Sequence, residues 1–132
     1  MSAAETKVVV TEAFREAYDT YHYAPAVKSK GHVYLSGVLV FPTGEGRPEE
    51  RYAAGVRAAF EHIREILTAA GSSFDQVIKL NTYHTDLNEG VQSFSQVKDE
   101  FITEPYPAWT AVGVAELGLG GLAEIEVTAT YD

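Results

Sequence analysis

Few side chains in this sequence are suited to acid–base or metal chemistry. The chain has no cysteine, which excludes a thiol nucleophile, a zinc–thiolate site and a disulfide framework. Its four histidines are His22, His32, His62 and His84. No two of them have the helical spacing of a metal-binding pair, so we expect no metal site. His22 is a candidate for acid–base work because it adjoins Tyr23.

Glu124 and Glu126 lie on one side of a predicted strand, because alternate residues of a strand face the same side. A carboxylate in an apolar cleft can have a raised pKa and act as a general acid or base. Both residues also fit simple solvation on an edge strand, and Glu126 fits solvation or an ion pair better.

Two aromatic residues are open to more than one interpretation. Trp109 is the single tryptophan of the chain, and tryptophan serves both in buried packing and in ligand or subunit contacts. Tyr23 fits either a strand aromatic or a site residue, since buried tyrosine hydroxyls usually find partners.

The elements that must position these residues follow from periodicity and turn chemistry. Alternating and β-branched residues predict strands over 6–10, 26–29, 32–40, 75–85, 108–114 and 123–131. Lys30-Gly31 is typical of a tight hairpin turn. Within 75–85, the alternation places Ile78 and Leu80 on one face and Val77 and Tyr83 on the other.

Two helices are predicted between these strands. Pro48, followed by two glutamates, predicts the first turn of a long helix that ends at Gly71. Its apolar face consists of Tyr52, Val56, Ala59, Ile63, Ile66 and Ala70. A second helix begins near Asp86 or Asn88, and we expect Pro105 and Pro107 to end it.

This order of elements indicates an α+β fold, a mixed sheet with both helices packed on one face. The chain of 132 residues has no spare element for the other face, so we expect oligomerisation to cover it. The length is that of one domain, and we expect residues 1–132 to form a single domain.

The net charge of −9 with 10 scattered basic residues argues against nucleic acid and against an anionic membrane surface as partners, because both require clustered cations. No apolar run has the length of a membrane span or a signal peptide. The simplest expectation is a cytoplasmic protein.

Several short motifs, in a fixed order, resemble those of the RidA (YjgF) family of enamine/imine deaminases. Tyr23-Ala24-Pro25-Ala26-Val27 resembles the family's Tyr-Ser-Gln-Ala-Val, and Val33-Tyr34-Leu35-Ser36-Gly37 resembles its Val-Tyr-Val-Ser-Gly. The further matches are Ala69-Ala70-Gly71, Val77-Ile78-Lys79, Thr85-Asp86-Leu87, Pro107-Ala108 and Glu124-Ile125-Glu126. Their number and order carry the resemblance, since no single motif is specific.

The resemblance implies a chorismate-mutase-like fold and a homotrimer with small-molecule sites in the clefts between subunits. It also implies hydrolysis of enamines or imines, such as 2-aminoacrylate, to a carbonyl compound and ammonia without a cofactor. Carried over residue by residue, Tyr23, Ser36 and Gly37 would bind substrate, and Glu124 would be catalytic by placing a water.

The sequence departs from the family at its substrate-binding arginine, where it has Trp109. Arginine binds a carboxylate through two parallel hydrogen bonds, whereas indole has one N–H donor and no charge. We therefore expect Trp109 to contact a neutral, aromatic or cationic substrate. A family asparagine also falls near Phe94 or Ser95 and has no counterpart here.

Two functions remain open from the sequence. The first is an enamine/imine deaminase of altered specificity, which the retained Tyr23, Ser36, Gly37 and Glu124 favour. The second is a non-catalytic small-molecule-binding trimer of the same fold, which Trp109 favours, since a fold alone does not fix a function. The family label of endoribonuclease is opposed by the acidic charge.

Overall fold

A computed structural model describes residues 6–132 of the chain, and it has a mixed sheet of seven strands. The sheet order is β1-β2-β3-β7-β5-β6, and β4 also pairs with β7. The strands are β1 (Thr6–Val9), β2 (Ala26–Ser29), β3 (His32–Leu35), β4 (Val38–Val40), β5 (Val77–His84), β6 (Ala108–Gly113) and β7 (Ala123–Thr130). Only the β5–β6 pair is parallel among the pairs that these residues form, so the α+β class predicted from the sequence is confirmed.

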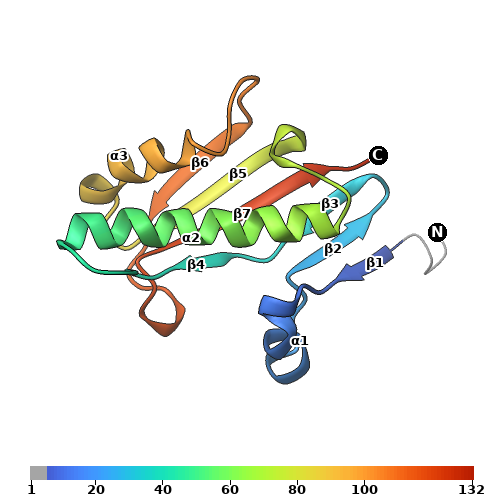
Figure 1. The fold of residues 1–132 in the computed structure, drawn as a ribbon. Helices are drawn as coiled ribbons and strands as arrows, with labels where there is room; N and C mark the ends of the chain where they lie inside the picture. The colour runs from blue at the N-terminus through green and yellow to red at the C-terminus, as the bar shows by residue number, and fades with distance from the viewer. Residues whose placement is uncertain (1–5) are drawn as a thin grey trace.

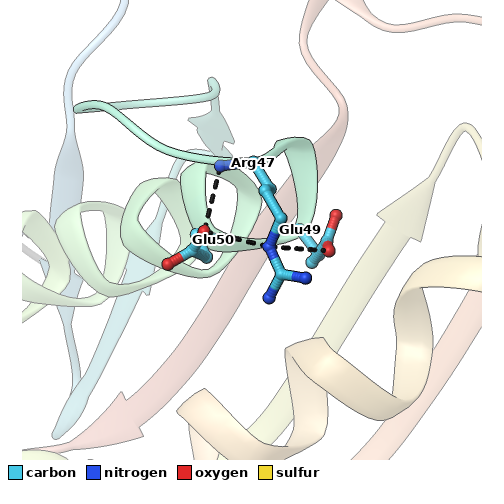
Figure 2. Close-up of polar contacts among 3 residues, drawn as sticks. All are labelled: Arg47, Glu49 and Glu50. Atoms are coloured by element: carbon cyan, nitrogen blue, oxygen red, sulfur yellow. Dashed lines mark hydrogen bonds and ion pairs between the residues drawn. The ribbon is translucent and has the colours of Figure 1, made fainter.

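The long helix α2 (Pro48–Ala69) begins as predicted, with proline in its first turn. The backbone N–H of Arg47 donates to Glu50 Oε1 at 3.0 Å, and the Arg47 side chain lies 3.4 Å from Glu49 Oε1, as Figure 2 shows. These contacts satisfy a free backbone donor and place acidic groups at the positive end of the helix. The helix ends at a left-handed Gly71, with φ of +80°.

The second predicted helix is α3 (Leu87–Lys98), with Asp86 as its N-cap residue. It ends at Lys98, well before the two prolines that were expected to end it. Both α2 and α3 lie on one face of the sheet (Figure 1), as predicted. The apolar core between them and the sheet includes Phe60, Ile63, Leu80, Phe94 and Ile125, all fully buried.

Two predictions about the N-terminal half were wrong. Residues 12–21 form a short 3-10 helix, Glu12–Phe14, followed by a third helix, α1 (Arg15–Tyr21). Neither element has a buried residue, although Phe14, Ala17, Tyr18 and Tyr21 recur at the three- and four-residue spacing of a helix. The strand expected over 32–40 is broken at Ser36 and Gly37 into β3 and β4.

The strands next to the core have a strict alternation that separates the two faces of the sheet. On β7, Ala123, Ile125 and Val127 are buried against the helices, whereas Glu124 and Glu126 are half-buried on the other face. A bulge near Val77 changes the alternation at the start of β5. Val77 is therefore buried together with Leu80, and Ile78 is exposed, contrary to the predicted facing.

Candidate functional site

A cavity of about 530 Å³ lies where β3 ends and β4 begins. Four of the five predicted site residues line it together: Tyr23, Ser36, Gly37 and Glu124. They come from three separate segments of the chain, namely the loop after α1, the break between β3 and β4, and strand β7. The other lining residues are mostly apolar and include Phe14, Val38, Leu39, Phe41 and Leu119.

Hydrogen bonds hold the Tyr23 segment against the strand break. Ser36 Oγ donates to the carbonyl oxygen of Ala24 at 2.6 Å, and the Ser36 backbone N–H donates to the carbonyl oxygen of Pro25 at 2.9 Å. The Ser36 side chain is therefore occupied in fixing the wall of the cavity. Ser36 thus shapes the site, and its hydroxyl hydrogen is already committed to Ala24.

Glu124 enters the cavity from β7, where it is paired with Leu39 of β4 and with Tyr83 of β5. Burial raises the pKa of the Glu124 carboxyl above its usual value, and the nearby charge of Glu126 raises this pKa further. Both causes disfavour the ionised form. The raised pKa fits the expectation for a carboxyl group in an apolar cleft, and a catalytic role for Glu124 stays a prediction.

Glu126 is held by neutral partners, although an ion pair or solvation was expected for it. The Tyr83 hydroxyl donates to Glu126 Oε1 at 2.9 Å, and Asn81 Nδ2 donates to the same oxygen at 3.2 Å. The hydrogen bond to Glu126 also raises the pKa of the Tyr83 hydroxyl. This network fixes a negative charge next to Glu124.

Trp109 lies on the face of the sheet that the helices cover and lines a different cavity. It is paired with Leu80 across β5 and β6, and its ring stacks on Phe94 with 6.2 Å between ring centroids. Its indole N–H donates to Thr82 Oγ1 at 2.9 Å. The buried Lys98 holds its ammonium 4.9 Å from the ring centroid. Within one chain, Trp109 is thus a packing residue of the core, and its contact with a substrate stays a prediction.

His62 is a lining residue of the Glu124 cavity that was not predicted. It comes from α2, its ring packs edge-on against Phe14 with 5.6 Å between centroids, and its Nδ1 atom is buried without a partner in the described part of the chain. No sequence signal separates it from an ordinary helix residue. It reaches this cavity because α2 packs against β4.

The acid–base candidate His22 does not line the cavity. It ends α1 in a left-handed conformation, with φ of 61°. Across residues 6–132 there is no group of three or more histidine, aspartate or glutamate side chains that could hold a metal ion. No helix in this range is long and apolar enough to cross a membrane.

Residues 14–131 match the model of a protein family described as Endoribonuclease L-PSP. The RutC family protein YjgH of Escherichia coli is 38% identical over 113 residues, which cover 85% of each chain. A 2-iminobutanoate/2-iminopropanoate deaminase of Bos taurus is 32% identical over 133 residues, covering 98% of this chain and 93% of the relative.

Solved structures agree with these sequence matches. A structure of protein YJGH aligns with a TM-score of 0.79 at 33% identity, covering 96% of this chain and 97% of that chain. RidA from a Psychrobacter bacterium aligns with a TM-score of 0.71 at 38% identity, covering 82% of this chain and 87% of that one.

Proposed function

Because the chain belongs to the RidA/YjgF family, whose model is described as Endoribonuclease L-PSP, we propose that it is an enamine/imine deaminase with altered substrate specificity. The observation that carries the proposal is the cavity in which Tyr23, Ser36, Gly37 and Glu124 meet. Relatives such as the Bos taurus protein are named as imine deaminases. A cytoplasmic location stays a prediction.

The proposed reaction requires only water and one proton-transferring group. Water adds its oxygen to the carbon of a protonated imine, and Glu124 accepts the proton that this water loses. Glu124 then returns this proton to the nitrogen of the carbinolamine. As the carbon–nitrogen bond breaks, the hydroxyl proton passes to Glu124, the carbonyl compound and ammonia leave, and the ammonia takes up that proton as ammonium. A carboxyl group whose pKa is raised by burial is a stronger base than an ordinary carboxylate, which suits it to accept the proton of the attacking water.

The proposed site has no arginine to bind a substrate carboxylate. Trp109 occupies the position of the family's arginine, and its single N–H is already donated to Thr82. The Glu124 cavity is mostly apolar, and nearby Glu126 adds a negative charge. We therefore propose a neutral, aromatic or cationic imine, because an anion would be repelled by both carboxylates.

We further propose that the active form is a homotrimer with the cavity in each cleft between subunits. In the described residues, both long helices pack on one face of the sheet, and the other face exposes Tyr34 and Val112. A neighbouring subunit that covers this face would close the Glu124 cavity. In such a trimer, residues of another copy can approach Glu124, and Trp109 of that copy is one candidate.

The rival function is a non-catalytic trimer that binds a small molecule in the same cleft. The loss of the arginine at Trp109 is the observation that favours it. The two functions differ in the role of Glu124, because a binding protein needs its shape and charge and an enzyme needs its proton transfer.

The test is hydrolysis of imines generated in situ, followed as ammonia release, with 2-iminopropanoate compared with imines that lack a carboxylate. We expect the imines without a carboxylate to be hydrolysed faster, and Glu124→Gln to lower the rate by at least about a hundredfold. Light scattering should give the mass of a trimer. Binding of the imines without turnover would favour the rival, and unchanged hydrolysis in Glu124→Gln would contradict the proposed role of Glu124.

A further inference from the structure

A separate cavity of about 340 Å³ lies on the helix side of the sheet, between the first turns of α2 and α3. Both turns lie at the same end of the helix layer in Figure 1. Its walls include Pro48 and Tyr52 of α2, Gly90 of α3, and Leu122 before β7. The two sets of lining residues have no member in common, so this cleft is distinct from the Glu124 cavity.

His84, at the end of β5, lines this cleft and is 1% exposed. Its Nε2 lies 2.8 Å from Thr82 Oγ1, which accepts the indole N–H of Trp109 at 2.9 Å. The Thr82 hydroxyl oxygen is thus an acceptor toward Trp109, and its own hydrogen is free to point at His84. In the arrangement in which this hydrogen points at His84, Nε2 is the acceptor of the bond.

In that arrangement the proton of His84 lies on Nδ1. Burial lowers the pKa of the imidazole below its usual value, so the ring is neutral near pH 7 and carries one N–H. Nδ1 is buried and has no partner among the described residues. An unpaired buried donor destabilises the protein by roughly 1 to 3 kcal/mol. A ligand that places a hydrogen-bond acceptor beside Nδ1 would remove this cost on binding.

Gly90 is a second unusual feature of the cleft. It lies inside α3, where glycine is unfavourable by about 1 kcal/mol relative to alanine. A Cβ atom on Gly90 would lie 3.2 Å from the Tyr52 hydroxyl. The glycine therefore lets the two helices approach without a side chain filling the space between them.

The charge around the cleft is negative. Glu49, Asp86 and Glu89 line it and are exposed, and no lysine or arginine is among the lining residues. Arg47 contacts Glu49 at 3.4 Å from outside the cleft, which leaves Asp86 and Glu89 to set the sign of the potential. A positively charged ligand is attracted to such a mouth and an anion is repelled.

We propose that this cleft is a second ligand site, for a small organic cation that also carries a carbonyl oxygen. The carbonyl accepts the Nδ1–H of His84, the ammonium lies beside the carboxylates of Asp86 and Glu89, and the apolar body rests on Tyr52 and Leu122. The cleft shares no lining residue with the Glu124 cavity, so a ligand bound here would not occupy the proposed deaminase site.

The probe is leucinamide, which has an ammonium, a carbonyl and an apolar body. It is compared by calorimetry with 4-methylpentanamide, which lacks the ammonium, and with 4-methylpentylamine, which lacks the carbonyl. We expect leucinamide to bind at millimolar concentration and each partial analogue to bind at least about fivefold more weakly, the effect of losing about 1 kcal/mol. Absence of leucinamide binding, or equal binding of all three, would overturn the proposal.

Two variants and one spectroscopic measurement locate the site. In Gly90→Leu the Tyr52 side chain must shift, because even a Cβ would lie 3.2 Å from its hydroxyl. A melting scan checks that this variant stays folded, and the leucine should abolish leucinamide binding by filling the cleft. Long-range 1H–15N NMR should show the His84 proton on Nδ1 and a shift of that resonance on binding. His84→Leu should weaken binding about fivefold; if it does not fold, Gly90→Leu and the NMR shift still decide. Binding that survives Gly90→Leu, or a proton on Nε2, would contradict the proposal.

Glu124→Gln is the matched control. It should leave leucinamide binding unchanged while it removes the proposed deaminase activity, and Gly90→Leu should do the reverse. Failure of the proposed function would appear as activity retained in Glu124→Gln, and failure of the second site would appear as binding retained in Gly90→Leu.

Discussion

The Cα atom of Gly37 lies directly against the carboxylate of Glu124. A Cβ atom at position 37 would lie 2.6 Å from both Cδ and Oε2 of Glu124. The atoms that it meets belong to a side chain, so the backbone can tolerate the change while the carboxylate moves. Only a glycine at the break between β3 and β4 allows the observed position of this carboxylate.

Gly37→Ala should therefore reduce activity far more than stability. A displacement of about 1 Å in a catalytic group can cost on the order of a hundredfold in rate, so we expect kcat/KM for imine hydrolysis to fall by about that factor. Gly118→Ala is the control, because a Cβ there meets nothing within 4 Å. Equal rates for Gly37→Ala and the unmodified protein would mean that Glu124 takes no part in the reaction.

The second prediction concerns the influence of Glu126 on Glu124. Glu126→Gln removes the negative charge but keeps an oxygen that can accept from Tyr83 and Asn81. The pKa of Glu124 should fall toward its usual value, although burial, the larger cause, keeps it raised. Carbon-13 NMR titration of the Glu124 carboxyl measures this directly. An unchanged titration would mean that the two carboxylates do not interact.

The raised pKa of Glu124 also predicts how stability depends on pH. Protonation is favoured in the folded state, so the stabilising contribution of Glu124 is fully present below the ordinary pKa of 4.5 and is lost as pH rises through the folded value. Glu124→Gln should therefore unfold at higher urea concentration than the unmodified protein at pH 7. The two should converge below the ordinary pKa. A difference in urea midpoint between the two proteins that widens as pH falls would contradict this prediction.

The helices and strands that border the core were predictable because each leaves a local signal. Pro48 and Gly71 mark the ends of α2, and the alternation of β7 separates Ile125 from Glu124. The helix α1 was missed although Phe14, Ala17, Tyr18 and Tyr21 have the three- and four-residue spacing of a helix. The helix is short, and none of its residues is buried, so this pattern spans only two turns.

Only those residues of the candidate site that belong to the family motifs could be predicted from the sequence. Those motifs named Tyr23, Ser36, Gly37 and Glu124, which the fold brings into one cavity. They gave no indication of His62, whose place in that cavity depends on how α2 crosses β4. Long-range packing of this kind joins residues that are far apart along the chain, and a single sequence does not specify it.

RNA binding is a further prediction, and it is negative despite the description of the family model. The net charge is −9, and affinity for a phosphate backbone depends on the number of phosphates that lysine and arginine neutralise. A gel-shift titration with single-stranded RNA at physiological salt should show no complex at micromolar protein. Saturable binding that weakens steeply with added salt would overturn this expectation.

The final prediction separates the two roles of Trp109. In the described chain its ring stacks on Phe94, its N–H is donated to Thr82, and Lys98 already holds a cation 4.9 Å from the ring centroid. Trp109→Arg removes the aromatic packing and brings a second positive charge beside Lys98, so we expect a loss of roughly 3 kcal/mol in the free energy of unfolding. Trp109→Phe keeps an aromatic ring against Phe94 but loses the second ring of the indole and the hydrogen bond to Thr82, which should cost about 1 to 2 kcal/mol.

Urea unfolding of both variants, with 2-iminopropanoate hydrolysis measured on each, decides between packing and substrate contact. If position 109 faces the cleft between subunits in the trimer, the arginine variant should instead fold normally and gain hydrolysis of the carboxylated imine, because guanidinium pairs with carboxylate through two hydrogen bonds. A destabilised Trp109→Arg together with a nearly normal Trp109→Phe would assign the residue to the core. The altered specificity would then result from the absence of the arginine, with no contribution from the indole.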